Sequence, residues 1–259
     1  MGAVPGHVRW RGLRLYQRAA DLTEPQRCLC GAIDKPTFGR TSQSASILPG
    51  KMPTVVFANR KGGVGKTLST LYTGRWLARA GRDVTLVDLD PQKSLWDIAA
   101  LLGRPEGVFT QRLRLASDGK IPAASGTRSW VLVDTPPALD GSLPALQQTD
   151  YVVIPVIPEA QEVAQLEKFL TMLEETRQDR PFARIVGILP VRYVRYWAGH
   201  RACLAAIEQL AAAFGHPVLE AVPTSQAVIR YSMQGGLWRH VASMLMALEP
   251  TAAELTRAA

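Results

Sequence analysis

The sequence predicts an α/β fold, with a mostly parallel, twisted sheet that is covered by helices on both faces. From residue 54 onward, short apolar segments of strand length alternate with longer segments of helical length. The short segments are mostly apolar and do not alternate strictly with polar residues, which is typical of parallel strands buried on both sides. The chain has 259 residues, of which 47% are hydrophobic and 20% charged, so it can form a folded domain with a full core.

The expected strands are short, rich in β-branched residues and followed by turn residues. They cover residues 54–58, 83–88, 130–134, 151–156, 184–190 and 218–221. The expected helices are longer, and glycines at positions 81 and 103 stop the first two. They cover residues 66–80, 91–102, 159–178, 197–214 and 237–257. This alternation of strand and helix places the strands side by side in parallel.

The first 51 residues differ from the rest of the chain. They hold eight Lys or Arg and three Asp or Glu, a net +5 of the +8 of the whole chain. Prolines and glycines interrupt any helical or strand period there. We expect a basic, mostly irregular arm over 1–51 and a folded α/β domain over 52–259. Two interpretations of the arm stay open: an additional contact to phosphates, or a wrongly assigned start upstream of Met52.

Several classes of protein do not fit the composition. No apolar segment approaches 18 residues, so a membrane span is not expected. The three cysteines, Cys28, Cys30 and Cys203, cannot form a disulfide framework in a chain of this size. The four histidines lack the spacing of metal ligands. The N-terminus has no pattern of a secretory leader, so we expect a cytoplasmic protein.

The strongest signal is the segment Arg-Lys-Gly-Gly-Val-Gly-Lys-Thr at 60–67, between the first strand and the first helix. Its glycines allow backbone N–H groups to turn around a phosphate chain, and the helix start adds partial positive charge. Lys66 can reach the outer phosphates, and the Thr67 hydroxyl can ligate Mg²⁺. We therefore expect a P-loop that binds ATP and Mg²⁺. The expected nucleotide contacts are Lys61, Gly62, Gly63, Val64, Gly65, Lys66 and Thr67.

Three aspartates follow two of the expected strands. Asp88 and Asp90 lie at the end of 83–88, and Asp134 ends 130–134. In an open parallel sheet, ligands bind at the carboxyl ends of the strands, so all three side chains should lie near the phosphates. Phosphoryl transfer needs such groups to hold Mg²⁺ and to orient the attacking water.

The loop has Arg60 where the general phosphate-loop pattern has glycine, and it has a second lysine, Lys61. In this form it resembles the deviant Walker A motif of the ParA/MinD family, P-loop ATPases of the SIMIBI class. The resemblance implies that Lys61 reaches across a nucleotide-sandwich homodimer to the partner's phosphates. It also implies that Asp90 activates water, that Asp134 acts on Mg²⁺ and that Asp88 supports the metal shell. Lys61, Lys66 and Asp90 would then be catalytic, and Thr67, Asp88 and Asp134 would serve the metal.

The resemblance runs from about residue 53 to the end of the chain. The Val-Pro pair ending at Pro223 resembles a family segment that contributes to adenine binding. Ser94, and the 43 residues between Asp90 and Asp134, resemble the small, ParF-like partition ATPases. The 1–51 arm is too short and too broken to be the helix-turn-helix domain of the larger forms.

The resemblance implies a segregation ATPase for a plasmid or chromosome. Its ATP-bound dimer would bind DNA nonspecifically, and a small centromere-binding partner of the ParB or ParG type would stimulate hydrolysis and release. Such a protein would be cytoplasmic and associated with the nucleoid. Basic residues of the C-terminal half, near Tyr193, Tyr196 and Trp197, are the expected DNA contacts. They are Arg192, Arg195, Arg201 and Arg230.

One alternative stays open: a related ATPase, MinD-like or associated with a secretion or synthesis machine, that positions or regulates a cargo other than DNA. A MinD-like protein would carry a basic amphipathic membrane helix at its C-terminus. Residues 237–248 are apolar but contain only two basic residues, Arg239 and His240, so we interpret this segment as core packing, without membrane contact.

Overall fold

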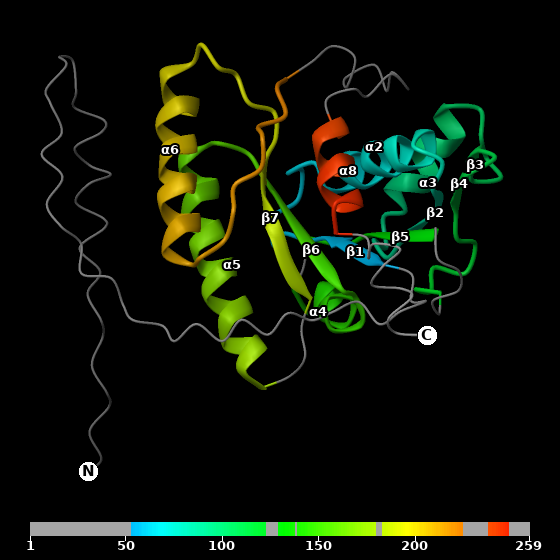
Figure 1. The fold of residues 1–259 in the computed structure, drawn as a ribbon, viewed down its shortest axis with the longest axis horizontal. Coiled ribbons are helices and arrows are strands. Elements are labelled where there is room, and N and C mark those ends of the chain that lie inside the picture. Colours follow the sequence, from blue (N-terminus) through cyan, green and yellow to red (C-terminus); the bar gives the residue numbers. More distant parts are fainter. Residues whose placement is uncertain (1–52, 123–128, 138, 180–182, 225–237, 249–259) are drawn as a thin grey trace, which may run out of the picture. The chain divides into compact units, whose positions relative to one another are not determined.

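The computed structural model describes residues 53–122, 129–137, 139–179, 183–224 and 238–248, and these residues contain a seven-stranded sheet (Figure 1). The strand order is β3-β4-β2-β5-β1-β6-β7. All neighbouring strands are parallel except β3 and β4, which form an antiparallel pair at one edge. The strands are β1 (Thr54–Phe57), β2 (Asp83–Asp88), β3 (Val108–Thr110), β4 (Leu113–Leu115), β5 (Ser129–Asp134), β6 (Tyr151–Val156) and β7 (Arg184–Pro190).

Helices cover both faces of this sheet (Figure 1). The helices α2, α3 and α8 pack on one face, and α4, α5 and α6 on the other. Their bounds are α2 (Lys66–Arg79), α3 (Ser94–Leu101), α4 (Leu139–Gln148), α5 (Ala160–Asp179), α6 (Ala198–Ala213) and α8 (Arg239–Met246). The predicted fold class is therefore confirmed.

Each central strand contributes to two separate cores. In β1, Val55 and Phe57 pack into the core under α2, whereas Val56 and the following Ala58 pack into the core under α5. Because side chains alternate between the faces of a strand, burial on both faces requires an unbroken apolar strand. This is the physical reason for the apolar segments in the sequence.

Two predicted elements differ from the structure. The helix expected over 91–102 begins only at Ser94, because Lys93 adopts a left-handed conformation with φ of 56°. The strand expected over 218–221 was wrong: within this segment only Val218 forms a bridge, an isolated one to Ile188, and the next bridge joins Pro223 to Tyr193. Since Pro190 has no N–H, it cannot donate the next hydrogen bond of the ladder, although its carbonyl still accepts the N–H of Val222 at 2.7 Å.

Other elements were not predicted from the sequence. The hairpin of β3 and β4 has only three residues in each strand, which is too short for a clear period. Helix α4 contains Pro144, a residue that argues against a helix in a sequence pattern.

The apolar segment at 238–248, which contains α8, packs against α2. Val241, Ala242 and Leu245 of α8 are buried, and the indole of Trp238 stacks on Tyr72 with 4.8 Å between ring centroids. The Trp238 Nε1–H also donates to the Ser69 hydroxyl at 3.1 Å. The predicted core packing of 237–248 therefore holds for its described part, residues 238–248. In the described part of the chain, no helix combines the length and apolar character needed to cross a membrane.

Some predictions fall on residues outside the described ranges. These are the 1–51 arm, its boundary at residue 52, the end of the helix expected over 237–257, and Arg230.

Candidate nucleotide site

The site lies at the carboxyl ends of three neighbouring strands, β2, β5 and β1. The loop at 60–67 follows β1 and leads into α2, and Asp134 ends β5. Asp88, the last residue of β2, is paired in register with Asp134. The structure thus brings the loop and the carboxylates to one edge of the sheet.

Two glycines give the loop its path. Gly63 and Gly65 have φ values of 76° and 81°, a region that residues with a Cβ rarely adopt. Gly65 is also the N-cap of α2, and a Cβ there would lie 3.5 Å from Cγ2 of Val191, which follows β7. The loop therefore needs glycine for its backbone conformation at both positions.

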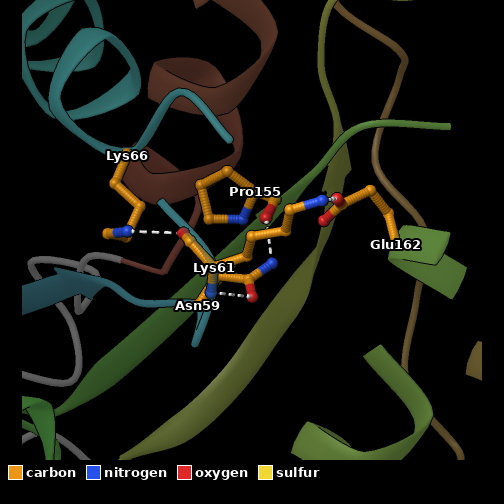
Figure 2. Close-up of polar contacts among 5 residues, drawn as sticks. All are labelled: Asn59, Lys61, Lys66, Pro155 and Glu162. Atoms are coloured by element: carbon orange, nitrogen blue, oxygen red, sulfur yellow. Dashed lines mark hydrogen bonds and ion pairs between the residues drawn. The ribbon is translucent and has the colours of Figure 1, made fainter. Parts of the chain in front are cut away.

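Asn59 anchors the start of the loop to strand β6 (Figure 2). Its buried side-chain amide donates to the carbonyl of Pro155 at 2.7 Å, and its Oδ1 accepts the N–H of Lys61 at 3.2 Å. The sequence reasoning did not single out Asn59. A polar residue directly after an apolar strand was the available signal.

The two lysines of the loop point in different directions (Figure 2). Lys66 is buried, and its Nζ donates to the carbonyl of Lys61 at 2.9 Å. Burial lowers the pKa of Lys66, while Asp134 and Asp90 act in the opposite direction. The ammonium of Lys61 instead forms an ion pair with Glu162, in the first turn of α5. Sequence reasoning had assigned Glu162 only to a helix, without a role.

Asp134 and Thr67 form the best candidate for a metal site. The Thr67 hydroxyl donates to Asp134 Oδ2 at 2.6 Å, and the buried Oδ1 accepts no hydrogen bond from the described residues. Burial raises the pKa of Asp134 to about 7; Asp88 and Asp90 add to this, while Thr67 and Lys66 oppose it. A hydroxyl beside a carboxylate with an unsatisfied oxygen fits Mg²⁺, which prefers oxygen ligands. Bound there, Mg²⁺ would neutralise charge on the nucleotide phosphates.

Asp88 organises the loop between β2 and α3. Its two carboxylate oxygens accept the backbone N–H groups of Asp90 at 3.1 Å and Leu95 at 3.0 Å. The Lys93 ammonium donates to the Asp88 carbonyl at 3.0 Å. Burial raises the pKa of Asp88, and these backbone hydrogen bonds oppose the shift. Asp88 therefore has a structural role in this loop. Its expected support of the metal shell stays a prediction.

Asp90 is also buried, and its Oδ1 accepts the N–H of Gln92 at 2.9 Å. This is the only hydrogen bond that its carboxylate accepts from the described residues. Oδ2 therefore has capacity for a further partner, such as a water molecule. The expected catalytic role of Asp90 stays a prediction.

The remaining expected contacts gather after β7. Pro223 forms a parallel bridge with Tyr193 and lines a cavity of about 720 Å³ together with Arg192 and Arg195. Arg201 donates to the Arg195 carbonyl at 3.1 Å. All three arginines are exposed, and so are the neighbouring Tyr196 and Trp197. The structure thus gathers three of the four expected DNA contacts in one region.

Comparisons with known proteins identify the family. A family model described as the CobQ/CobB/MinD/ParA nucleotide binding domain matches residues 55–238. The chain is 32% identical over 179 residues to the chromosome-partitioning ATPase Soj of Thermus thermophilus, covering 57% of this chain and 72% of Soj. It is 29% identical over 191 residues to the maintenance of carboxysome distribution protein A of Halothiobacillus neapolitanus, covering 71% and 85%.

A solved structure agrees with this relationship. Cobyrinic acid a,c-diamide synthase from Mycobacterium smegmatis, with bound ADP and magnesium, superposes with a TM-score of 0.58 at 25% identity. The superposition covers 75% of this chain and 94% of that one. The chain therefore belongs to the CobQ/CobB/MinD/ParA family of nucleotide-binding proteins and, within it, to the ParA/MinD type of ATPase.

Proposed function

We propose that the protein is a partition ATPase that segregates a plasmid or chromosome. With ATP and Mg²⁺ it forms a homodimer that binds DNA nonspecifically. A small centromere-binding partner stimulates hydrolysis, and hydrolysis releases the DNA. The protein works in the cytoplasm, associated with the nucleoid.

The arrangement of the two loop lysines is the main support for this proposal (Figure 2). Lys66 is buried close to Asp134 and Asp90, as expected of a lysine that serves phosphates bound by its own subunit. Lys61 extends away from Lys66, and its side chain is 38% exposed. A second subunit has access to Lys61, which agrees with a role across a dimer interface.

The other residues of the site have separate roles within one subunit. The loop backbone and Lys66 bind the phosphates, and Pro223 contributes to the binding of the adenine. Thr67 and Asp134 hold Mg²⁺, with Asp88 fixing the neighbouring loop, and Asp90 orients the attacking water.

Replacing Lys61 tests the dimer. The Lys61→Ala variant should still bind some nucleotide, because Lys66 and the loop backbone remain, but it should lose ATP-dependent dimerisation and hydrolysis. Sedimentation with a slowly hydrolysed ATP analogue measures this directly. Lys120→Ala, which removes an exposed lysine from another loop, is the matched control and should dimerise like the wild type. A normal dimer in the Lys61 variant would refute the role of this lysine in the second subunit.

Replacing the exposed arginines tests the DNA contact. Each phosphate contact contributes about 0.9 to the slope of log affinity against log salt. The Arg195→Ala/Arg201→Ala variant, measured as the dimer bound to the ATP analogue, should therefore bind random duplex DNA with a slope shallower by about 2 units. Arg104→Ala, exposed in the loop after α3, is the control for loss of a positive charge. If the double variant keeps the wild-type slope, these arginines do not contact the DNA.

A second function is favoured by one observation: the similarity to a protein named for carboxysome distribution, over 85% of that protein. In this alternative the ATPase positions a cargo other than DNA. A wild-type chain that dimerises with the ATP analogue but binds no DNA at low salt would favour this alternative over segregation.

A further inference from the structure

The ion pair between Lys61 and Glu162 lies within one subunit and joins residues 101 positions apart in the chain. Glu162 belongs to the first turn of α5, on the side of the loop opposite to Lys66 (Figure 2). Its side chain is 1% exposed, whereas that of Lys61 is 38% exposed. The pair therefore joins a buried anion to a cation at the protein surface.

Lys61 is the cation that compensates the buried Glu162 carboxylate. Among the described residues, Glu162 Oε2 accepts no hydrogen bond, so the contact to Lys61 is its main polar interaction. Glu162 also lies in the first turn of α5, at the positive end of the helix dipole. Removing the cation is unfavourable, because the buried Glu162 carboxylate then stays behind without compensation.

The backbone of Lys61 is fixed on both sides. Its N–H donates to Asn59, and its carbonyl accepts the ammonium of Lys66. Only the side chain of Lys61 is therefore free to move without disturbing the loop. If it turns toward phosphates in a second subunit, it must leave Glu162, which belongs to a different element of its own subunit.

We infer that Glu162 is a positioning residue that holds Lys61 within its own subunit and opposes dimerisation until ATP phosphates in a second subunit replace it. This inference rests on the proposed function, since it assumes the ATP-dependent dimer. Lys61 exchanges one anionic partner for another, and the cost of leaving Glu162 buried sets the protein concentration at which the dimer forms. Glu162 thereby limits dimerisation at low protein concentration.

The Glu162→Gln variant tests the inference, because it keeps the size of the side chain and removes its charge. In the nucleotide-free protein, an amine-acylating reagent followed by peptide mass spectrometry should modify Lys61 about tenfold faster than in the wild type. With the slowly hydrolysed ATP analogue, the midpoint of dimerisation should move to a roughly tenfold lower protein concentration. Glu167→Gln, an exposed glutamate on the same helix, is the matched control and should change neither value.

Thermal melting supplies a second readout that needs no dimer. Lys61→Ala should lower the melting temperature by leaving Glu162 without its cation, and adding Glu162→Gln to that variant should recover most of the loss. If the melting temperature falls equally in Lys61→Ala and in the double variant, Lys61 does not compensate the charge of Glu162.

The outcomes separate this inference from the proposed function. Unchanged labelling of Lys61 in Glu162→Gln would overturn the inference, and so would faster labelling with an unchanged dimerisation midpoint. If the wild-type protein does not dimerise with the ATP analogue, the result contradicts the proposed function. It also contradicts the inference that Glu162 opposes dimerisation. Labelling and melting then still decide whether Glu162 holds Lys61.

Discussion

Replacing Asp90 by asparagine is expected to slow ATP hydrolysis by about 10²–10⁴-fold while the ATP-bound dimer still forms. Asparagine keeps an oxygen that can accept the N–H of Gln92, as Oδ1 of Asp90 does at 2.9 Å, so the turn after β2 should be preserved. It lacks the negative charge with which the carboxylate polarises water. A phosphate-release assay under single-turnover conditions measures the loss, and sedimentation with ATP itself should find a trapped dimer.

The comparison with Asp90→Ala separates chemistry from folding. Alanine removes both the charge and the turn acceptor, so its additional effects report on the loop before α3. Gln92→Ala, which keeps the backbone N–H and both aspartates, is the control and should hydrolyse ATP near the wild-type rate. Hydrolysis at the wild-type rate in Asp90→Asn would assign Asp90 to the turn alone.

The Asp134→Asn variant is expected to be more stable than the wild type at pH 8, measured by urea unfolding in EDTA. The pKa of Asp134 is about 7 in the folded protein and 3.8 as the ordinary value, because burial disfavours the charged form. Between about pH 4 and 7 the unfolded chain has lost this proton while the folded chain keeps it. The free energy of unfolding therefore falls as pH rises through this window, and the contribution is constant above it.

The expected size follows from the shift. A difference of about 3 pKa units corresponds to a free energy on the order of 4 kcal/mol. Asparagine resembles the protonated acid and does not titrate, so the two proteins should be similar near pH 4 and should diverge up to pH 7. Asp118→Asn, at an exposed loop position, should follow the wild type at every pH. A difference between Asp134→Asn and the wild type that is independent of pH would contradict the raised pKa of the buried Asp134 carboxyl.

Most of the sheet could be predicted because its signals are local. The strands β2, β6 and β7 have the expected bounds, since each is a short, mostly apolar segment rich in β-branched residues. The exceptions have local causes as well. The segment at 218–221 has strand-like composition, but its partner strand ends in Pro190, which lacks the N–H that would continue the ladder.

The sequence by itself determined the class of fold, the place of the phosphate loop, and the strands whose ends carry Asp88 and Asp134. These properties depend on the types of residues and on short spacings between them. Both are present in the sequence before any long-range contact forms. Only the tertiary structure decided the partners of the loop: Pro155 for Asn59 and Glu162 for Lys61. These partners lie 96 and 101 residues away. Strand β6 and helix α5 reach the loop because β6 packs beside β1, and no local pattern encodes which buried carboxylate a loop lysine will then meet.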